Sequence, residues 1–199
     1  MTNQVDQASV TATDIFTDRH TAYGFDGAPV SDAELARIYE LAKFTPTAMN
    51  GQPLRVVFVR SEAGKQRLVP LLAEGNQAKS LSAPVVAILA ADTEFHVNLP
   101  VTNPQMAGAK EWLDSDPDTR AVIAANNAWL QAGGFILAVR AAGLDAGPMT
   151  GFDNAGVDAE FFDGTALRSI MVVNIGHVAD GGNFPRNPRL GFDQAVTLL

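Results

Sequence analysis

The chain has 199 residues, of which 47% are hydrophobic and 18% are charged, and it contains no cysteine. This composition is typical of a globular protein and excludes disulfides, thiolate nucleophiles, iron–sulfur clusters and cysteine-ligated zinc. The formal net charge of −8 repels phosphate backbones and argues against nucleic acid as a partner.

The first residues are polar and lack the basic and apolar parts of an export signal, so a cytoplasmic protein is expected, with residues 1–13 as a flexible N-terminus. Ser31 to Glu34 fits a capping box, which predicts a helix over 32–44 that ends at Thr45-Pro46. Apolar runs predict strands, and further helices are expected between them. The predicted strands are 56–59, 84–90 and 169–175, and the further helices lie near 62–73 and 153–162.

Strands separated by helices indicate a sheet layered with helices, and the absence of repeats or linkers favours one domain over 1–199. A long apolar helix should begin at Pro117, capped by Asp116, and end at Gly143. Polar residues such as Gln131 and Arg140 interrupt it, so no membrane span is expected. Because it is apolar on nearly every side, either a large core or a second subunit must cover it.

Two stretches fit no regular element. Residues 92–117 hold three prolines together with Phe95, His96 and Trp112, and a connection of that length is typical of a functional lid. The tail after Gly176 is rich in glycine and proline and is expected to run over a surface.

The common nucleotide-binding and nucleophile motifs are absent from the sequence. The three histidines are too widely spaced for a sequence-local metal pair, and no metal site is predicted. Four short segments stand out instead. They are Arg19-His20-Thr21, the loop 46–53 with Asn50 and Gln52, the run Pro148-Met149-Thr150-Gly151, and a tail segment with Arg186 and Arg189.

Each segment can be interpreted either as part of a ligand-binding site or as a structural or solvent-exposed segment without such a role. The arginines could clamp a phosphate or could simply be solvated. Asn50 and Gln52 could meet the mixed donor and acceptor edge of a pyrimidine-like ring, or could satisfy their own turn. The run Pro148 to Gly151 could let a planar ligand lie against the main chain, or could be a plain connection.

In this order and spacing, the four segments resemble the FMN-dependent nitroreductase family, from about residue 14 to the end. The resemblance implies an α+β fold, layered α/β/α, with a mixed central sheet wrapped by helices in an intertwined homodimer. Within the family, the chain looks most like the malonic semialdehyde (3-oxopropanoate) reductases of pyrimidine degradation. Residues 147–153 and 174–176 are among the stretches that carry this narrower likeness.

The resemblance also assigns residues to FMN. Arg19 and Thr21, with His20, would hold the ribityl-phosphate, and Arg189, with Arg186, would bind the phosphate. Asn50 and Gln52 would address the ring edge. Pro148, Met149, Thr150 and Gly151 would lie along the ring, with the backbone of the last two near N5. Tyr23 stands where relatives often carry a basic residue.

The function implied is an NAD(P)H oxidoreductase, using NADPH or NADH, in which hydride passes through flavin N5 and no side chain acts as a nucleophile. A substrate carboxylate would need a cation, for which His20, Lys110 and Arg120 are candidates, and Phe95 or Trp112 could stack over the ring. The alternatives are a broad nitroaromatic or quinone reductase, a non-catalytic flavin-binding module, and a cofactor-free interaction domain.

Overall fold

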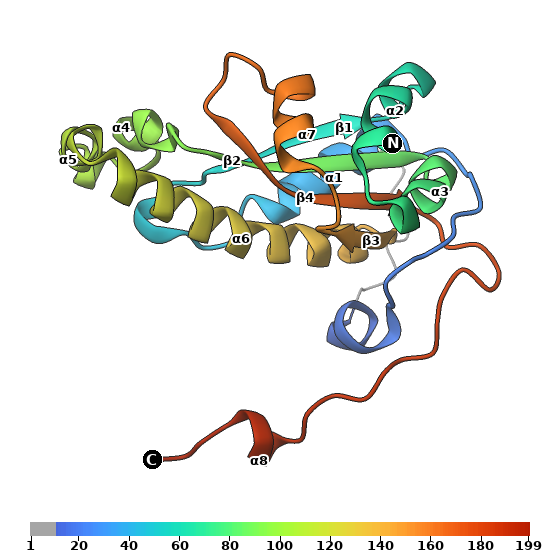
Figure 1. The fold of residues 1–199 in the computed structure, drawn as a ribbon. Helices are drawn as coiled ribbons and strands as arrows, with labels where there is room; N and C mark the ends of the chain where they lie inside the picture. The colour runs from blue at the N-terminus through green and yellow to red at the C-terminus, as the bar shows by residue number, and fades with distance from the viewer. Residues whose placement is uncertain (1–10) are drawn as a thin grey trace, which may run out of the picture.

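The computed structural model describes residues 11–199, which are built around a four-stranded sheet (Figure 1). The strands are β1 (Leu54–Val59), β2 (Val85–Asp92), β3 (Asp145–Met149) and β4 (Leu167–Gly176), in the order β1-β2-β4-β3. All three strand pairs are antiparallel. The layered α+β class is confirmed, whereas the mixed sheet expected from the resemblance is antiparallel throughout the described residues.

Helices cover both faces of this sheet. On one face lie α1 (Asp32–Ala42) and α6 (Pro117–Ala141), which pack on Ala87 and Leu89 of β2. On the other lie α2 (Glu62–Leu68), α3 (Glu74–Ser82) and α7 (Asn154–Phe161), on the side of Val86 and Ile88. The predicted run 84–90 is therefore an interior strand, apolar on both faces because both faces are covered.

The helix starts follow their capping residues. The Glu34 amide donates to Ser31 Oγ at 3.2 Å and the Ser31 amide donates to Glu34 Oε2 at 2.7 Å, so the capping box of α1 is confirmed. Asp116 accepts from the Thr119 amide at 3.0 Å and begins α6. The helix predicted near 62–73 is divided, with α2 followed by a 3-10 turn, η3 (Val69–Leu71).

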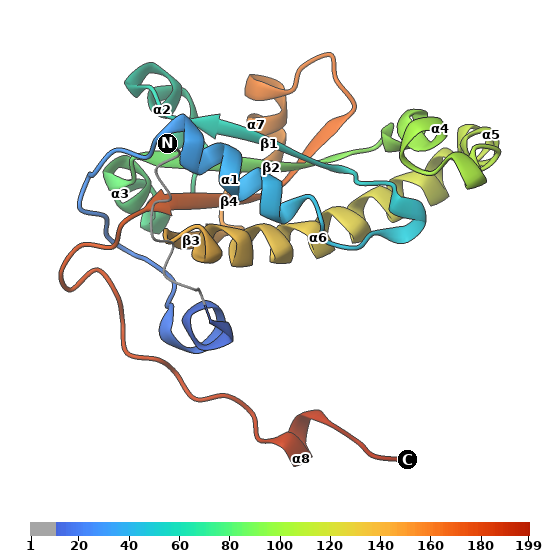
Figure 2. The ribbon, with the colours of Figure 1, turned by 180° about the vertical axis from the view of Figure 1, so that it is seen from behind.

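One side of α6 is left bare in this chain. Ala128, Ala132 and Phe135 are buried against the sheet, whereas Val122 and Leu130 are each 59% exposed and Trp129 is 44% exposed. By length and composition α6 could cross a membrane, although the core helix of a soluble protein passes the same test. Its inner side instead packs on the sheet and on α1, as Figure 2 shows from behind.

The segment 92–117 is more regular than expected. It forms four short elements, η4 (Phe95–Asn98), α4 (Leu99–Thr102), η5 (Pro104–Met106) and α5 (Ala109–Ser115). Phe95, Leu99 and Leu113 are fully buried there against Ala124 of α6. Each element is too short to produce a helical repeat in the sequence, so the prediction of an irregular connection was wrong.

Strand β3 is the strand that the sequence did not predict, and α3 is a helix that it did not predict. Strand β3 contains Gly147 and Pro148, which disfavour a strand, but it lies at the sheet edge, where proline is tolerated. A Cβ on Gly147 would lie 2.6 Å from the Ala22 carbonyl oxygen, so only glycine fits where the chain passes. After β4 the chain forms an extended tail with one short helix, α8 (Phe192–Ala195), below the sheet in Figures 1 and 2.

Candidate functional site

A small basic pocket of about 140 Å³ lies between the N-terminal segment, the end of α6 and the tail. It brings together five of the predicted residues from opposite ends of the chain. They are Arg19, His20, Thr21, Arg186 and Arg189. Tyr23 also lines the pocket, and so does Arg140 of α6, which the sequence motifs did not single out.

The basic residues are held by the main chain around them. Arg19 Nη1 donates to Asp145 Oδ1 at 2.9 Å, and Arg186 Nη2 donates to the Arg19 carbonyl at 2.9 Å. The His20 ring nitrogen Nδ1 lies 3.1 Å from the Phe184 carbonyl oxygen. The tail therefore closes over the N-terminal segment and forms one wall of the pocket.

Positive charge predominates in this pocket. Four arginines line it, and Asp145 is the carboxylate bonded to one of them. Burial lowers the pKa of the Arg140 guanidinium, and the charges of Arg186 and Arg19 lower that pKa further, whereas Asp145 acts in the opposite direction. An anion placed among these arginines would relieve their repulsion, so the pocket favours a multiply charged anion.

The predicted run 148–151 lies beside the same pocket. The Ala22 amide donates to the Ala146 carbonyl at 3.1 Å, which fixes the N-terminal segment along β3. Thr150 and Gly151 follow β3 and are exposed. The basic pocket and this main-chain run are therefore neighbours.

Two residues of α3, Asn76 and Lys79, join these parts and were missed by sequence reasoning. Asn76 Nδ2 donates to the Gly151 carbonyl at 2.8 Å. Lys79 Nζ lies 5.0 Å from the centroid of the Tyr23 ring, and burial lowers the pKa of Lys79. Their helix carries no recognisable motif, and a position facing the site is visible only once the chain is folded.

The loop 46–53 has an unusual backbone. Met49, Asn50 and Gln52 have φ values of 56°, 53° and 48°, in the left-handed region that side chains other than glycine rarely adopt. Gly51 between them has no room for a side chain, because a Cβ would lie 2.7 Å from the Phe95 ring. Such local strain persists where surrounding contacts impose it, and it clusters at ligand sites.

Buried amides of α6 impose this loop conformation. Asn127 Oδ1 accepts from the Ala48 amide at 2.7 Å, and Gln131 Oε1 accepts from the Leu54 amide at 2.9 Å. Asn50 Nδ2 in turn donates to the Thr102 carbonyl at 2.7 Å. The predicted ring-edge loop and the segment 92–117 are thus tied together.

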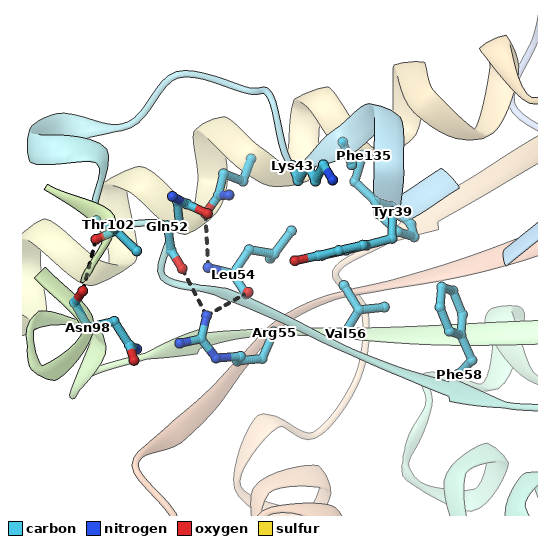
Figure 3. Close-up of a pocket in the computed structure, with 13 residues that line it drawn as sticks. Tyr39, Lys43, Gln52, Leu54, Arg55, Val56, Phe58, Asn98, Thr102 and Phe135 are labelled. Carbon is cyan, nitrogen blue, oxygen red and sulfur yellow. Dashed lines mark hydrogen bonds between the residues drawn. The ribbon is translucent and has the colours of Figure 1, made fainter. Parts of the chain in front are cut away.

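A larger cavity of about 480 Å³ adjoins this loop (Figure 3). In the view, Gln52, Arg55, Asn98 and Thr102 form its polar end, and Tyr39 lies at the opposite end with Val56, Phe58 and Phe135. Arg55 is neutralised by Asp92 at 2.6 Å. The cavity lies along β1, which among residues 11–199 pairs only with β2 and forms an edge of the sheet.

One chain does not bring all four predicted segments together. The loop 46–53 is bonded to Asn127, and the basic pocket contains Arg140, thirteen residues further along α6. At 1.5 Å per residue these positions are about 20 Å apart along the helix. The segments 19–21 and 186–189 line one pocket, the run 148–151 is linked to it through β3 and α3, and Gln52 lines the separate cavity along β1.

The remaining candidates are placed as follows. Phe95 is fully buried, so it is part of the core in this chain, whereas Trp112 is 48% exposed. Asp114 accepts from Lys110 Nζ at 2.5 Å and lies 2.6 Å from His96 Nε2, contacts that lower its pKa. Arg120 Nη1 lies 3.9 Å from the same carboxylate. Lys110 and Arg120 are thus both paired with Asp114.

Comparisons with known proteins agree with this fold. The model of the "Nitroreductase family" matches residues 16–177. A protein of Streptomyces coelicolor named "Putative NADH dehydrogenase/NAD(P)H nitroreductase" is 54% identical over 182 residues, covering 92% of this chain and 90% of its own length. A protein of Leptothrix cholodnii with the same name is 49% identical over 185 residues, covering 93% and 94%.

A solved structure shares the architecture at lower identity. The chain described as a "putative nitroreductase in complex with FMN" from Exiguobacterium sibiricum superposes with a TM-score of 0.84, at 22% identity, covering 97% of this chain and 99% of that one. This chain belongs to the nitroreductase family, as the family model and the relatives at about half identity show.

Proposed function

We propose that the chain is an FMN-dependent NAD(P)H oxidoreductase with a broad range of flat acceptors, such as nitroaromatics and quinones. The observation that carries the proposal is the four-arginine pocket, which α3 links to the exposed residues Thr150 and Gly151 through Asn76 and through Lys79, which lies over Tyr23. The names of the curated relatives, which include NAD(P)H nitroreductase, support the same class of reaction.

The residues fit FMN chemically. Arg140 Nε is buried without a hydrogen-bond partner among the described residues, as expected of a donor that awaits an anion. Arg19, Arg140, Arg186 and Arg189 would hold the phosphate, and His20 and Thr21 the chain that leads to the ring. Pro148 to Gly151 would lie along the ring, where Thr150 and Gly151 are exposed and the absence of a side chain at Gly151 leaves its main chain accessible.

When bound, FMN supplies a ring that accepts hydride from NADH or NADPH and gives it to an acceptor. The protein's part is to bind and orient. The main-chain N–H groups of Thr150 and Gly151 would favour negative charge on the reduced ring. Asn76 fixes the Gly151 carbonyl and so holds this main chain in place. No side-chain nucleophile is needed.

A second copy of the chain would complete the site. Asn50 and Gln52 cannot reach the basic pocket of their own chain, but a homodimer could place one protomer's loop 46–53 over the pocket of its partner. Several surfaces favour such a dimer. They are the exposed side of α6, the unpaired edge of β1, and the exposed apolar tail residues Leu190, Phe192 and Leu198.

Reduction of 3-oxopropanoate is the narrower alternative, supported by the likeness over residues 147–153. That acceptor carries a carboxylate and would need an available cation near the ring. Lys110 and Arg120 are paired with Asp114, and His20 contacts the Phe184 carbonyl. The broad specificity is therefore the reading that we favour.

The experiment is to purify the full chain and record its visible spectrum before and after anaerobic addition of NADPH or NADH. We expect a yellow protein that is bleached by the nicotinamide and reoxidised by a nitrofuran or a quinone faster than by 3-oxopropanoate. A colour that no nicotinamide bleaches would indicate a flavin-binding module, and a protein that binds no flavin would refute the proposal. Faster turnover of 3-oxopropanoate than of the nitrofuran or the quinone would favour the narrower alternative over the broad specificity.

A further inference from the structure

Arg140 is the unexpected member of the basic pocket. It lies in the last turn of α6, far in sequence from both the N-terminal segment and the tail, and it faces the same pocket as Arg19 and Arg186. Its Nη1 donates to the Ile15 carbonyl at 3.0 Å, in η1 (Asp14–Asp18). That single bond leaves most of the five N–H donors of the guanidinium available.

A guanidinium N–H that is buried without a hydrogen-bond partner costs free energy. Arg140 Nε is buried and has no partner among residues 11–199, and a buried donor without a partner is rare in native proteins. Asp145, whose charge also acts on Arg140, is bonded to other groups, because its Oδ1 accepts from Arg19 and its Oδ2 accepts from the Val178 amide at 3.1 Å. Arg140 therefore lies next to two like charges without a counter-ion of its own.

The charge and size of the pocket define the ligand that would satisfy it. Four arginines against one carboxylate leave an excess that a phosphate dianion matches better than a phosphodiester does. The volume of about 140 Å³ is small beside the 480 Å³ of the cavity along β1, and it suits a phosphoryl group.

We propose that Arg140 is a phosphate-binding residue that makes the site selective for a terminal phosphomonoester, and hence for FMN over riboflavin and FAD. This inference rests on the proposed flavin function. Arg19 comes from the N-terminal segment and Arg186 and Arg189 come from the extended tail, whereas Arg140 comes from a long helix packed on the sheet. Arg140 thus supplies the charge whose position is set by the core of the fold.

The test compares the flavin-free full chain with Arg140→Gln and with a control, Arg37→Gln, which changes an exposed arginine of α1. Affinities for FMN, riboflavin and FAD are measured by quenching of flavin fluorescence. We expect Arg140→Gln to weaken FMN binding about ten- to a hundred-fold, as for the loss of one charged hydrogen bond. Riboflavin binding should be unchanged, so the preference for FMN should shrink. Arg37→Gln should bind all three flavins as the parent does.

Thermal melting with inorganic phosphate separates binding from a structural role. Phosphate should raise the melting temperature of the parent more than that of Arg140→Gln, and without phosphate the variant should be at least as stable, because a buried repulsion has been removed. Arg140→Gln could instead melt at a lower temperature, yet gain as much melting temperature from phosphate as the parent and keep the parent's preference for FMN. This result would show that Arg140 only stabilises the fold through its hydrogen bond to the Ile15 carbonyl. That result would overturn the inference and leave the proposed function standing, whereas failure of the parent to bind any flavin would overturn the proposed function itself.

Discussion

Arg19 and Asp145 are 126 positions apart in the sequence, and their side chains are joined by a 2.9 Å hydrogen-bonded ion pair. The Asp145 side chain is only 9% exposed, and its second oxygen accepts from the Val178 amide at the start of the tail. One carboxylate thus positions both the N-terminal arginine and the segment that carries Arg186 and Arg189.

Replacing Asp145 should therefore weaken the fold and the anion site together. We expect Asp145→Asn to lower the free energy of unfolding by about 1–3 kcal/mol, because a buried donor loses its acceptor. Urea denaturation of the flavin-free protein measures this change. In a double-mutant cycle with Arg19→Gln the two losses should be non-additive by more than about 0.5 kcal/mol. Simple additivity would mean that the pair does not act as a unit.

Adjacent asparagines of α6 offer a matched test of the strained loop. Asn127 is buried and holds the Ala48 amide, whereas Asn126 is exposed. Asn127→Ala should cost about 1–3 kcal/mol and should increase amide hydrogen exchange in the loop 46–53, because the Ala48 amide loses its acceptor and the buried Asn127 side chain is removed. Asn126→Ala should change stability by less than about 0.5 kcal/mol. Equal effects at the two positions would show that Asn127 does not support the loop.

Local signals in the sequence predicted three of the four strands and the helices α1, α2, α6 and α7, but not α3. The capping residues Ser31 and Asp116 placed the starts of two helices, and apolar runs placed three of the four strands, because caps and periodicity act over a few residues. Strand β3 escaped because Gly147 and Pro148 look like a turn. Their place in the strand depends on an edge position and on the close approach of Ala22, and neither is a local property.

The candidate site was predicted in part for the same reason. Arg19 and Arg186 belong to short recognisable segments and do meet, whereas Asn76 and Arg140 are single polar residues on helices. A signal for Arg140 was present, since a charged residue in the last turn of an apolar helix must find a partner or an opening to solvent. Nothing in the sequence predicts where the Arg140 side chain points, because this depends on how α6 packs on the sheet.

The contact between α6 and the segment that follows α1 depends on a glycine. A Cβ on Gly134 would lie 1.9 Å from Thr45 Oγ1, whereas a Cβ on the adjacent Gly133 would meet nothing within 4 Å. Gly134→Ala should destabilise the protein by about 1–3 kcal/mol through overpacking. Gly133→Ala should be neutral, or stabilising by up to about 1 kcal/mol through helix propensity. Thermal and urea denaturation would compare the two, and a stabilising Gly134→Ala would contradict the close packing.

The capping box predicts a pH dependence with a definite sign. The Ser31 backbone amide, followed by its hydroxyl, lowers the pKa of Glu34 from the ordinary value of 4.5. A lowered pKa in the folded state means that the stabilisation is present above pH 4.5 and is lost as the pH falls through the lowered value. Ser31→Ala should raise the Glu34 pKa only part of the way, since the backbone donor remains, and should cost about 1 kcal/mol at neutral pH.

Carboxyl NMR titration of Glu34 measures the shift directly. Denaturation of Ser31→Ala and the parent should differ less at pH 3 than at pH 7, because protonation weakens the box in the parent as well. Glu34→Gln serves as a control, since it keeps the side chain's length and removes its titration. A Glu34 pKa that is the same in Ser31→Ala and the parent would contradict the hydroxyl contribution.

Trp129 tests whether a second copy covers α6. Its side chain is 44% exposed on the bare side of the helix, next to the exposed Leu130, so Trp129→Glu should leave the protomer folded and remove the apolar contact. Light scattering should find a dimer for the parent and a monomer for the variant at the same concentration. Flavin affinity should fall with the dimer, because the partner's Gln52 would be lost from the site. Leu81→Glu, a change at an exposed residue of α3 on the other face of the sheet, should alter neither property. A Trp129→Glu dimer as stable as the parent would place the interface on another surface, and a monomer with undiminished flavin affinity would show that one chain binds the flavin alone.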